Sequence, residues 1–207
     1  MGETPDMWII KNRDYAVSWS VGFSDSNILG GRSKYLSLNT TGAIATYNNL
    51  WGTSDAQISS TTIGAAGDRS INISGDDYVG YFFKAKQGYS KFGKYVGNGN
   101  GSNGPFIYTG FKPAWVMIKN LDATQVWILF DSGRTPFNRD DAVNSIYPSA
   151  TSAEYTGASY HGVDMMSNGF KVKLTDAAVN TSGTDYLYMA FAESPFVTST
   201  GIPTTAR

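Results

Sequence analysis

The chain has 207 residues, with 16 basic and 17 acidic side chains, so its net charge is -1 and only 16% of its residues are charged. No basic stripe is present, which argues against sequence-independent binding to nucleic-acid phosphates. The absence of cysteine and the single histidine, His161, exclude disulfide scaffolding, thiol catalysis and the usual zinc ligand sets. Because no apolar run reaches 18 residues and no basic segment leads into an apolar one at the N-terminus, we expect neither membrane insertion nor a signal peptide.

Alternating polarity and enrichment in β-branched and aromatic residues dominate the chain, and no window carries a sustained helical stripe. In chain order, the predicted strands are residues 7–11, 15–20, 34–38, 78–84, 91–96, 106–109, 115–119, 125–130, 170–174 and 186–192. Short strands at this spacing are typical of an antiparallel sandwich. We therefore predict an all-β, antiparallel β-sandwich.

The first half of the sequence recurs 108 residues later, near the start and near the end of each copy. The matching positions are Pro5 and Pro113, 10–12 and 118–120, Asp14 and Asp122, Trp19 and Trp127, 72–78 and 180–186, and Phe83 and Phe191. A constant offset means that the two copies have equal length. We expect two tandem related lobes with the same strand order.

The predicted lobes are residues 1–87 and 113–207, joined by a connecting hairpin at 88–112 that is rich in glycine and asparagine. Strands 91–96 and 106–109 are expected to pair with each other across the glycine-rich loop at 97–104. The first copy lacks an equivalent of this hairpin, which suggests that a longer chain carries one upstream. A second hairpin is predicted with Asn168-Gly169 as its two-residue turn.

Candidate catalytic groups are few. Three pairs of acids occupy equivalent positions in both copies, which is explained better by a shared turn than by one active site: Asp14 and Asp122, Asp68 and Asp176, and Asp77 and Asp185. The glycine-rich loop leads into Pro105 and a strand instead of a lysine and a helix, so it does not favour a phosphate site. His161 has no nucleophile elbow beside it. We predict no catalytic residue, cofactor or metal, although calcium held by the oxygen-rich segment 131–141, or a glycosidase carboxylate pair, remain alternatives.

Recognition is expected where the copies differ. Segment 131–141 departs from its counterpart, and an arginine there could meet an acidic sugar or a carboxylate. Aromatic residues in turn-like contexts are candidates for stacking on a sugar face, whereas Trp19 and Trp127 lie within strand patterns and are expected in the core. The predicted ligand-binding residues are Trp51, Arg134, Asn138, Asp140, Tyr155, Tyr160 and His161.

Several segments of the second half carry a resemblance to a known group of proteins. They are residues 88–93 (Gly-Tyr-Ser-Lys-Phe-Gly), 97–99 (Gly-Asn-Gly), 104–111 (Gly-Pro-Phe-Ile-Tyr-Thr-Gly-Phe), 113–119 (Pro-Ala-Trp-Val-Met-Ile-Lys) and 188–196 (Tyr-Met-Ala-Phe-Ala-Glu-Ser-Pro-Phe). With them, the chain resembles the C-terminal repeats of tail-fibre and virion structural proteins of tailed bacteriophages.

The resemblance implies a non-enzymatic, receptor-binding module at the tip of a virion fibre or of an extracellular fibre derived from one. Such a module would be trimeric through the rest of the fibre, and its partner would be a bacterial cell-surface glycan or an outer-membrane protein. A polysaccharide depolymerase and a structural decoration domain of the virion are the alternative functions.

Overall fold

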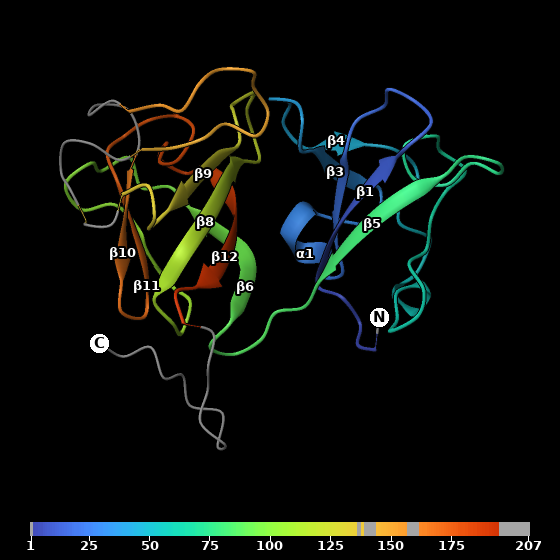
Figure 1. Cartoon of the computed structure of the whole chain (residues 1–207), viewed down its shortest axis with the longest axis horizontal. Coiled ribbons are helices and arrows are strands. Elements are labelled where there is room, and N and C mark those ends of the chain that lie inside the picture. The colour runs from blue at the N-terminus through green and yellow to red at the C-terminus, as the bar shows by residue number, and fades with distance from the viewer. Residues whose placement is uncertain (1, 136–137, 139–143, 157–161, 195–207) are drawn as a thin grey trace. The chain divides into compact units, whose positions relative to one another are not determined.

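The computed structural model describes residues 2–135, 138, 144–156 and 162–194, and divides into two compact units at the bond between Lys84 and Ala85 (Figure 1). The twelve strands found in these residues pair only in antiparallel fashion. Helix is confined there to α1 (Ser26–Leu29) and the single 3-10 turn η1 (Asp55–Gln57). The predicted all-β, sandwich-like fold is confirmed.

Unit 1 contains one five-stranded sheet. Its strands are β1 (Met7–Asn12), β2 (Ser20–Phe23), β3 (Lys34–Ser37), β4 (Ala45–Thr46) and β5 (Tyr78–Phe83), in the order β4-β3-β2-β1-β5. Irregular chain between β4 and β5 covers one face of the sheet and places Trp51 against Trp8, with the rings 5.4 Å apart and edge-on. Gly22 is required beneath them, because a Cβ there would lie 2.5 Å from the Trp8 Nε1.

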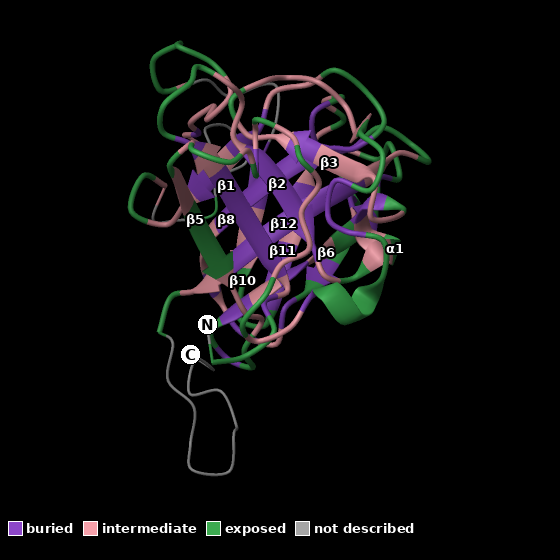
Figure 2. Cartoon of the chain, turned by 90° about the vertical axis from the view of Figure 1, so that its right-hand side faces the viewer, coloured by how far each residue is buried: buried purple, intermediate pink, exposed green. Residues whose placement is uncertain are grey.

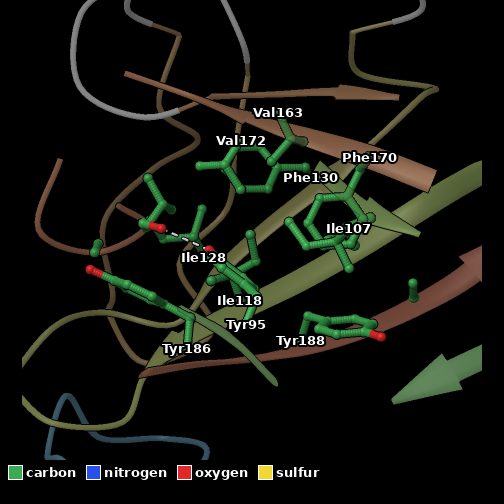
Figure 3. Close-up of a cluster of buried hydrophobic side chains, with 14 of the residues drawn as sticks. Tyr95, Ile107, Ile118, Ile128, Phe130, Val163, Phe170, Val172, Tyr186 and Tyr188 are labelled. Atoms are coloured by element: carbon green, nitrogen blue, oxygen red, sulfur yellow. Dashed lines mark hydrogen bonds between the residues drawn. The ribbon is translucent and has the colours of Figure 1, made fainter. Parts of the chain in front are cut away.

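Unit 2 is a two-sheet sandwich. One sheet has the order β6-β12-β8-β9 and the other the order β10-β11-β7. Their strands are β6 (Ser90–Val96), β7 (Phe106–Tyr108), β8 (Pro113–Asn120), β9 (Ile128–Asp131), β10 (Gly162–Met166), β11 (Gly169–Lys173) and β12 (Asp185–Ala192). Apolar side chains from both sheets meet in one core, including Ile118, Phe130, Val163 and Phe170 (Figure 3).

The duplication is confirmed by strand order. In unit 1 β1 pairs with β2 and β5, and in unit 2 β8 pairs with β9 and β12, each strand lying at the position that the 108-residue offset assigns to it. The three strands β2-β1-β5 and β9-β8-β12 are therefore the common framework of the two units.

A buried asparagine ends the central strand of each framework. The Asn12 Oδ1 accepts hydrogen bonds from the backbone N–H groups of Asp14 and Tyr15, at 2.8 and 3.0 Å, and its Nδ2 donates to the Arg69 carbonyl at 2.8 Å. One amide thereby joins the turn after β1 to a turn that is distant in the sequence.

Unit 2 repeats this arrangement. The Asn120 Oδ1 accepts from the backbone N–H groups of Asp122 and Ala123, both at 2.9 Å, and its Nδ2 donates to the Ala177 carbonyl at 2.7 Å. The bonded partners are 108 residues from those of Asn12, so the polar framework is duplicated together with the strands.

The first tyrosine of the last framework strand completes the network. The Tyr78 hydroxyl donates to the Arg69 carbonyl and accepts from the Ile73 N–H, and the Tyr186 hydroxyl bonds Ala177 and Thr181 in the same way, at 2.9 and 2.8 Å.

Two of the three duplicated pairs of acids are turn residues, as the sequence predicts, whereas Asp185 of the third pair begins β12 and forms an ion pair with Lys94. Asp14 and Asp122 accept from the backbone N–H groups of Asp77 and Asp185, at 2.5 and 2.9 Å. Asp68 and Asp176 each accept from the N–H two residues ahead, at 2.8 and 2.7 Å. Their carboxylates therefore stabilise turns in both units.

The predicted hairpin within 88–112 is wrong. β6 pairs with β12 and β7 pairs with β11, so the glycine-rich loop crosses from one sheet of unit 2 to the other. Asn180 sets this path: its Oδ1 accepts from the N–H groups of Asn98 and Gly99, and its Nδ2 donates to the carbonyls of Asn100 and Leu174.

The hairpin between β10 and β11 exists, but its two-residue loop is 167–168 instead of Asn168-Gly169, because Met166 pairs with Gly169. Gly169 is needed for a different reason. A Cβ at this position would lie 2.1 Å from the Ile107 carbonyl oxygen of neighbouring β7, so glycine permits the strands to approach.

Three further expectations need correction. The strand predicted at 15–20 begins only at Ser20, because the chain first forms the turn that Asn12 holds. The strands β4 and β10 were not predicted. Trp127 is buried in unit 2 as predicted. Trp19 is only half-buried, and its ring stacks on Tyr81 with centroids 6.3 Å apart.

The duplicated positions Asn180 and Asn72 give a matched test of the network. Asn180→Ala should lower the free energy of unfolding by about 3 kcal/mol, because buried backbone groups lose their partners. Asn72 is exposed, and Asn72→Ala should cost less than about 0.5 kcal/mol. Urea denaturation of both variants measures the difference, and equal losses would contradict this account of the loop.

Lys119 makes stability depend on pH. It is fully buried, and its Nζ donates to the Asn120 carbonyl at 2.7 Å. Burial lowers the pKa of Lys119 to about 8, against about 10.4 in the unfolded chain. Between these values the unfolded chain binds more protons, so the free energy of unfolding should rise with pH by about 1 kcal/mol per unit.

Above pH ~10 the trend reverses, since burial raises the pKa of Tyr188 to about 12 and the unfolded chain loses tyrosine protons first. Urea denaturation at several pH values should therefore show a maximum near pH ~10. Lys119→Met should lack the rise from pH ~8, and parallel curves for the two proteins would refute this role of Lys119.

Candidate functional site

Arg134, one of the predicted site residues, lies in the loop after β9. Its guanidinium forms ion pairs with Asp131 at 2.7 Å and with Glu154 at 3.1 Å, and its backbone N–H donates to the Asp131 Oδ1. These contacts join the loop to the segment that carries Glu154. The two carboxylates hold the guanidinium in this position, and ligand binding by Arg134 stays a prediction.

Asn138 and Tyr155 also have structural contacts. The Asn138 amide pairs with the backbone of Met165 in β10, accepting from its N–H at 2.8 Å and donating to its carbonyl at 3.1 Å. Tyr155 is half-buried, and its backbone bridges to that of Ser145. The structure brings Arg134 next to the Tyr155 segment through Glu154. The other predicted site residues of this region, Asp140, Tyr160 and His161, lie outside the described residues.

Trp51 is not a surface residue. Only 1% of it is exposed, and its Nε1 donates to the Lys34 carbonyl at 2.9 Å. The prediction that it stacks on a ligand is wrong, although its turn-like context was identified correctly. The reason is that unit 1 covers its sheet with irregular chain, so the ring from this turn fills the core.

A pocket of about 410 Å³ lies in unit 2 beside the edge strand β7. Its lining residues are Ala85, Lys86, Gln87, Ser90, Lys91, Tyr108, Thr109 and Gly110. In β7 the buried side chain of Ile107 anchors the strand in the core, whereas Phe106 and Tyr108 are 49% and 59% exposed. Alternation along one short strand therefore presents two aromatic rings to the surface.

Two turns form the pocket walls. Residues 86–90 close on themselves through paired backbone hydrogen bonds between Lys86 and Ser90, and Gly88 has a φ of 72° that favours glycine. Opposite, the N–H groups of Thr109 and Gly110 both donate to the Asn168 carbonyl. Backbone hydrogen bonds therefore fix the course of both turns, from which the lining side chains extend.

Lys91, one of the two lysines that line the pocket, lies next to the aromatic ring of Tyr108. The Lys91 Nζ donates to the Tyr108 carbonyl at 2.8 Å and lies 5.3 Å from the centre of the Tyr108 ring. An open ring face beside ammonium, amide and hydroxyl groups can stack on an apolar face and donate hydrogen bonds to neighbouring oxygens.

The lining of this pocket is neutral or cationic. None of its lining residues is an acid, whereas glycoside hydrolysis normally needs two carboxylates. No group of three or more potential metal ligands occurs among the residues whose placement the structure gives. In those residues no helix is long and apolar enough to cross a membrane.

Sequence reasoning missed Tyr108 as a site residue, although the strand itself was predicted. The signal was the triplet Phe-Ile-Tyr between Pro105 and Thr109. Because side chains alternate along a strand, the two aromatic side chains must lie on the face opposite to that of Ile107. The sequence could not predict which of the two faces is buried, because that depends on packing against the other sheet of unit 2.

Together, fold and site define an all-β protein built from a duplicated antiparallel framework, with a pocket in unit 2 that Tyr108 lines with its aromatic ring. Residues 1–195 match the family described as a domain of unknown function, DUF7483, and the chain belongs to that family. The match spans both units. No curated protein and no solved structure matches the chain.

The burial of Trp51 changes the result expected from its substitution. Trp51→Ala should lower the free energy of unfolding by about 3 to 5 kcal/mol, because it opens a large cavity and removes a contact with Trp8. Trp19→Ala, at a half-buried stacked ring, should cost less than half as much. Thermal and urea denaturation measure both, and an unchanged stability of Trp51→Ala would show that this core is misplaced.

Proposed function

We propose that this protein is a non-enzymatic binding module that recognises a glycan on the bacterial cell surface through the pocket beside β7. The observation that carries the proposal is the exposed Tyr108 ring, which lies beside Lys91 in a pocket without acidic residues. Sugars present flat C–H faces ringed by hydroxyl groups, and this combination of an aromatic face with polar donors suits them.

The resemblance to phage fibre repeats supports a setting in which weak contacts are sufficient. Of the segments that carry it, 88–93 and 104–111 contribute most of the pocket lining. A fibre tip displays several copies of its module, typically three, so modest affinities are multiplied when the linkers allow simultaneous contact. We therefore propose a place at the tip of a phage or phage-derived fibre, as a homotrimer held by the rest of that fibre.

Substitution of Tyr108 tests the site. Tyr108→Ala should weaken binding to the cognate glycan about fivefold per site, because an aromatic stacking contact contributes about 1 kcal/mol. Stability should change little, since the ring is mostly exposed and Lys91 bonds the backbone of residue 108. A glycan array screened with the wild-type protein identifies the ligand, and titration calorimetry then compares the variants.

Tyr47→Ala is the matched control, because Tyr47 is an exposed tyrosine of unit 1, outside the pocket. Normal binding by Tyr108→Ala, or equal losses in the two variants, would show that the pocket is not the glycan site. Incubation with capsule or lipopolysaccharide separates binding from hydrolysis: released oligosaccharides would indicate a depolymerase. Failure to bind any glycan or intact cells would favour a decoration domain.

A further inference from the structure

The two units differ at the outer edge of the framework. In unit 2, β6 covers the edge of β12 along seven residue pairs, from Asp185↔Val96 to Phe191↔Ser90. In unit 1 the equivalent strand, β5, pairs with β1 alone in the described part of the chain. Figure 2 shows the contrast in burial, with β1 largely buried and β5 exposed or intermediate.

The backbone groups at this open edge can be assigned from the repeat. In β12 the even-numbered residues face β6, as the bonds from the Gly97 N–H to the Thr184 carbonyl and from the Ala192 N–H to the Tyr89 carbonyl require. The equivalent residues of β5, 108 positions earlier, are Tyr78, Gly80 and Phe82, so their backbone N–H and C=O groups face the open edge. The Arg13 N–H bonds the Asp77 carbonyl, so the odd-numbered residues face β1 and the assignment agrees.

A pocket of about 460 Å³ in unit 1 adjoins this edge, and its lining includes Ile10, Ile71, Asn72 and Phe82. The equivalent residues of unit 2, at 118, 179, 180 and 190, are all buried. In unit 2, these four residues are covered by β6, by the loop that follows it and by the second sheet.

Tyr95 of β6 is the side chain that enters this space. Its ring stacks on Tyr186 with centroids 5.1 Å apart, and its hydroxyl donates to the Val179 carbonyl at 2.7 Å (Figure 3). The loop after β6 then bonds the Asn180 amide. Unit 1 retains the equivalent partners of all three contacts: the Tyr78 ring, the Ile71 carbonyl and the Asn72 amide.

We propose that β5 and its adjoining pocket form an acceptor groove for an antiparallel strand donated by another polypeptide. The donor has the pattern of residues 90–100: an extended segment with an aromatic residue at the position of Tyr95, followed by a glycine- and asparagine-rich loop. Its backbone pairs with Tyr78, Gly80 and Phe82, its aromatic ring enters the pocket, and its loop bonds Asn72. A second copy of this chain does not supply the strand, because its own β6 is paired with its own β12.

The test uses the full chain and a synthetic peptide with the sequence of residues 88–105. Titration to about 1 mM peptide should show saturable one-to-one binding. Hydrogen exchange followed by NMR should slow at the amides of Tyr78, Gly80 and Phe82. Amides of β12 should be unchanged. A peptide with Tyr95→Ala should bind at least tenfold more weakly, and one with Gly93→Pro should not bind, because it lacks an N–H directed at β5.

On the protein side, Asn72→Ala should weaken peptide binding about fivefold, the loss expected for roughly one hydrogen bond. Asn48→Ala, at an exposed asparagine of the same unit outside the pocket, should bind normally. Both variants should keep wild-type stability. Four results would overturn the proposal: no saturation, equal binding of the Gly93→Pro peptide, protection confined to β12, or self-association of the chain that protects β5 without peptide.

Discussion

Each unit depends on one buried asparagine side chain at the end of its central strand. Asn12 and Asn120 each accept two hydrogen bonds from a local turn and donate one to the carbonyl of a turn 57 residues away. Only an amide does both, since an ionised aspartate has no donor and a serine hydroxyl is too short to reach across the turn. The strands on either side therefore keep a fixed register in both copies.

This network constrains only part of each unit. It joins the central strand, the turn that contains Asp68 or Asp176, and the strand whose first tyrosine is Tyr78 or Tyr186. The intervening chain is free to differ and does: unit 1 covers its framework with irregular chain around Trp51, whereas unit 2 uses β7, β10 and β11. The same apolar face is buried in both cases, by chain with different secondary structure.

The sequence was sufficient for the strand order that the two copies share. A constant offset predicted equal strand order, and the repeated acids were predicted to be turn residues, because both features depend on local patterns. The burial of Trp51 could not be predicted this way, since it depends on what the intervening segment packs against. The partners of β6 and β7 were also beyond reach, because strand pairing is set by contacts distant in the sequence, such as Tyr95 with Tyr186. Among the predicted binding residues, Arg134 and Asn138 proved to have structural contacts.

The framework also explains why the edges of the two units are so different. An open strand edge invites pairing with other chains, and proteins usually protect such edges with charge, proline or short length. β7 is an edge strand of three residues that follows Pro105, so it is protected, and its exposed rings can serve as a contact surface. β5 has six residues, Tyr-Val-Gly-Tyr-Phe-Phe, without a charge or a proline. An open edge of this composition tends to pair with another strand, and the arrangement of β6 on β12 shows how such a strand would lie.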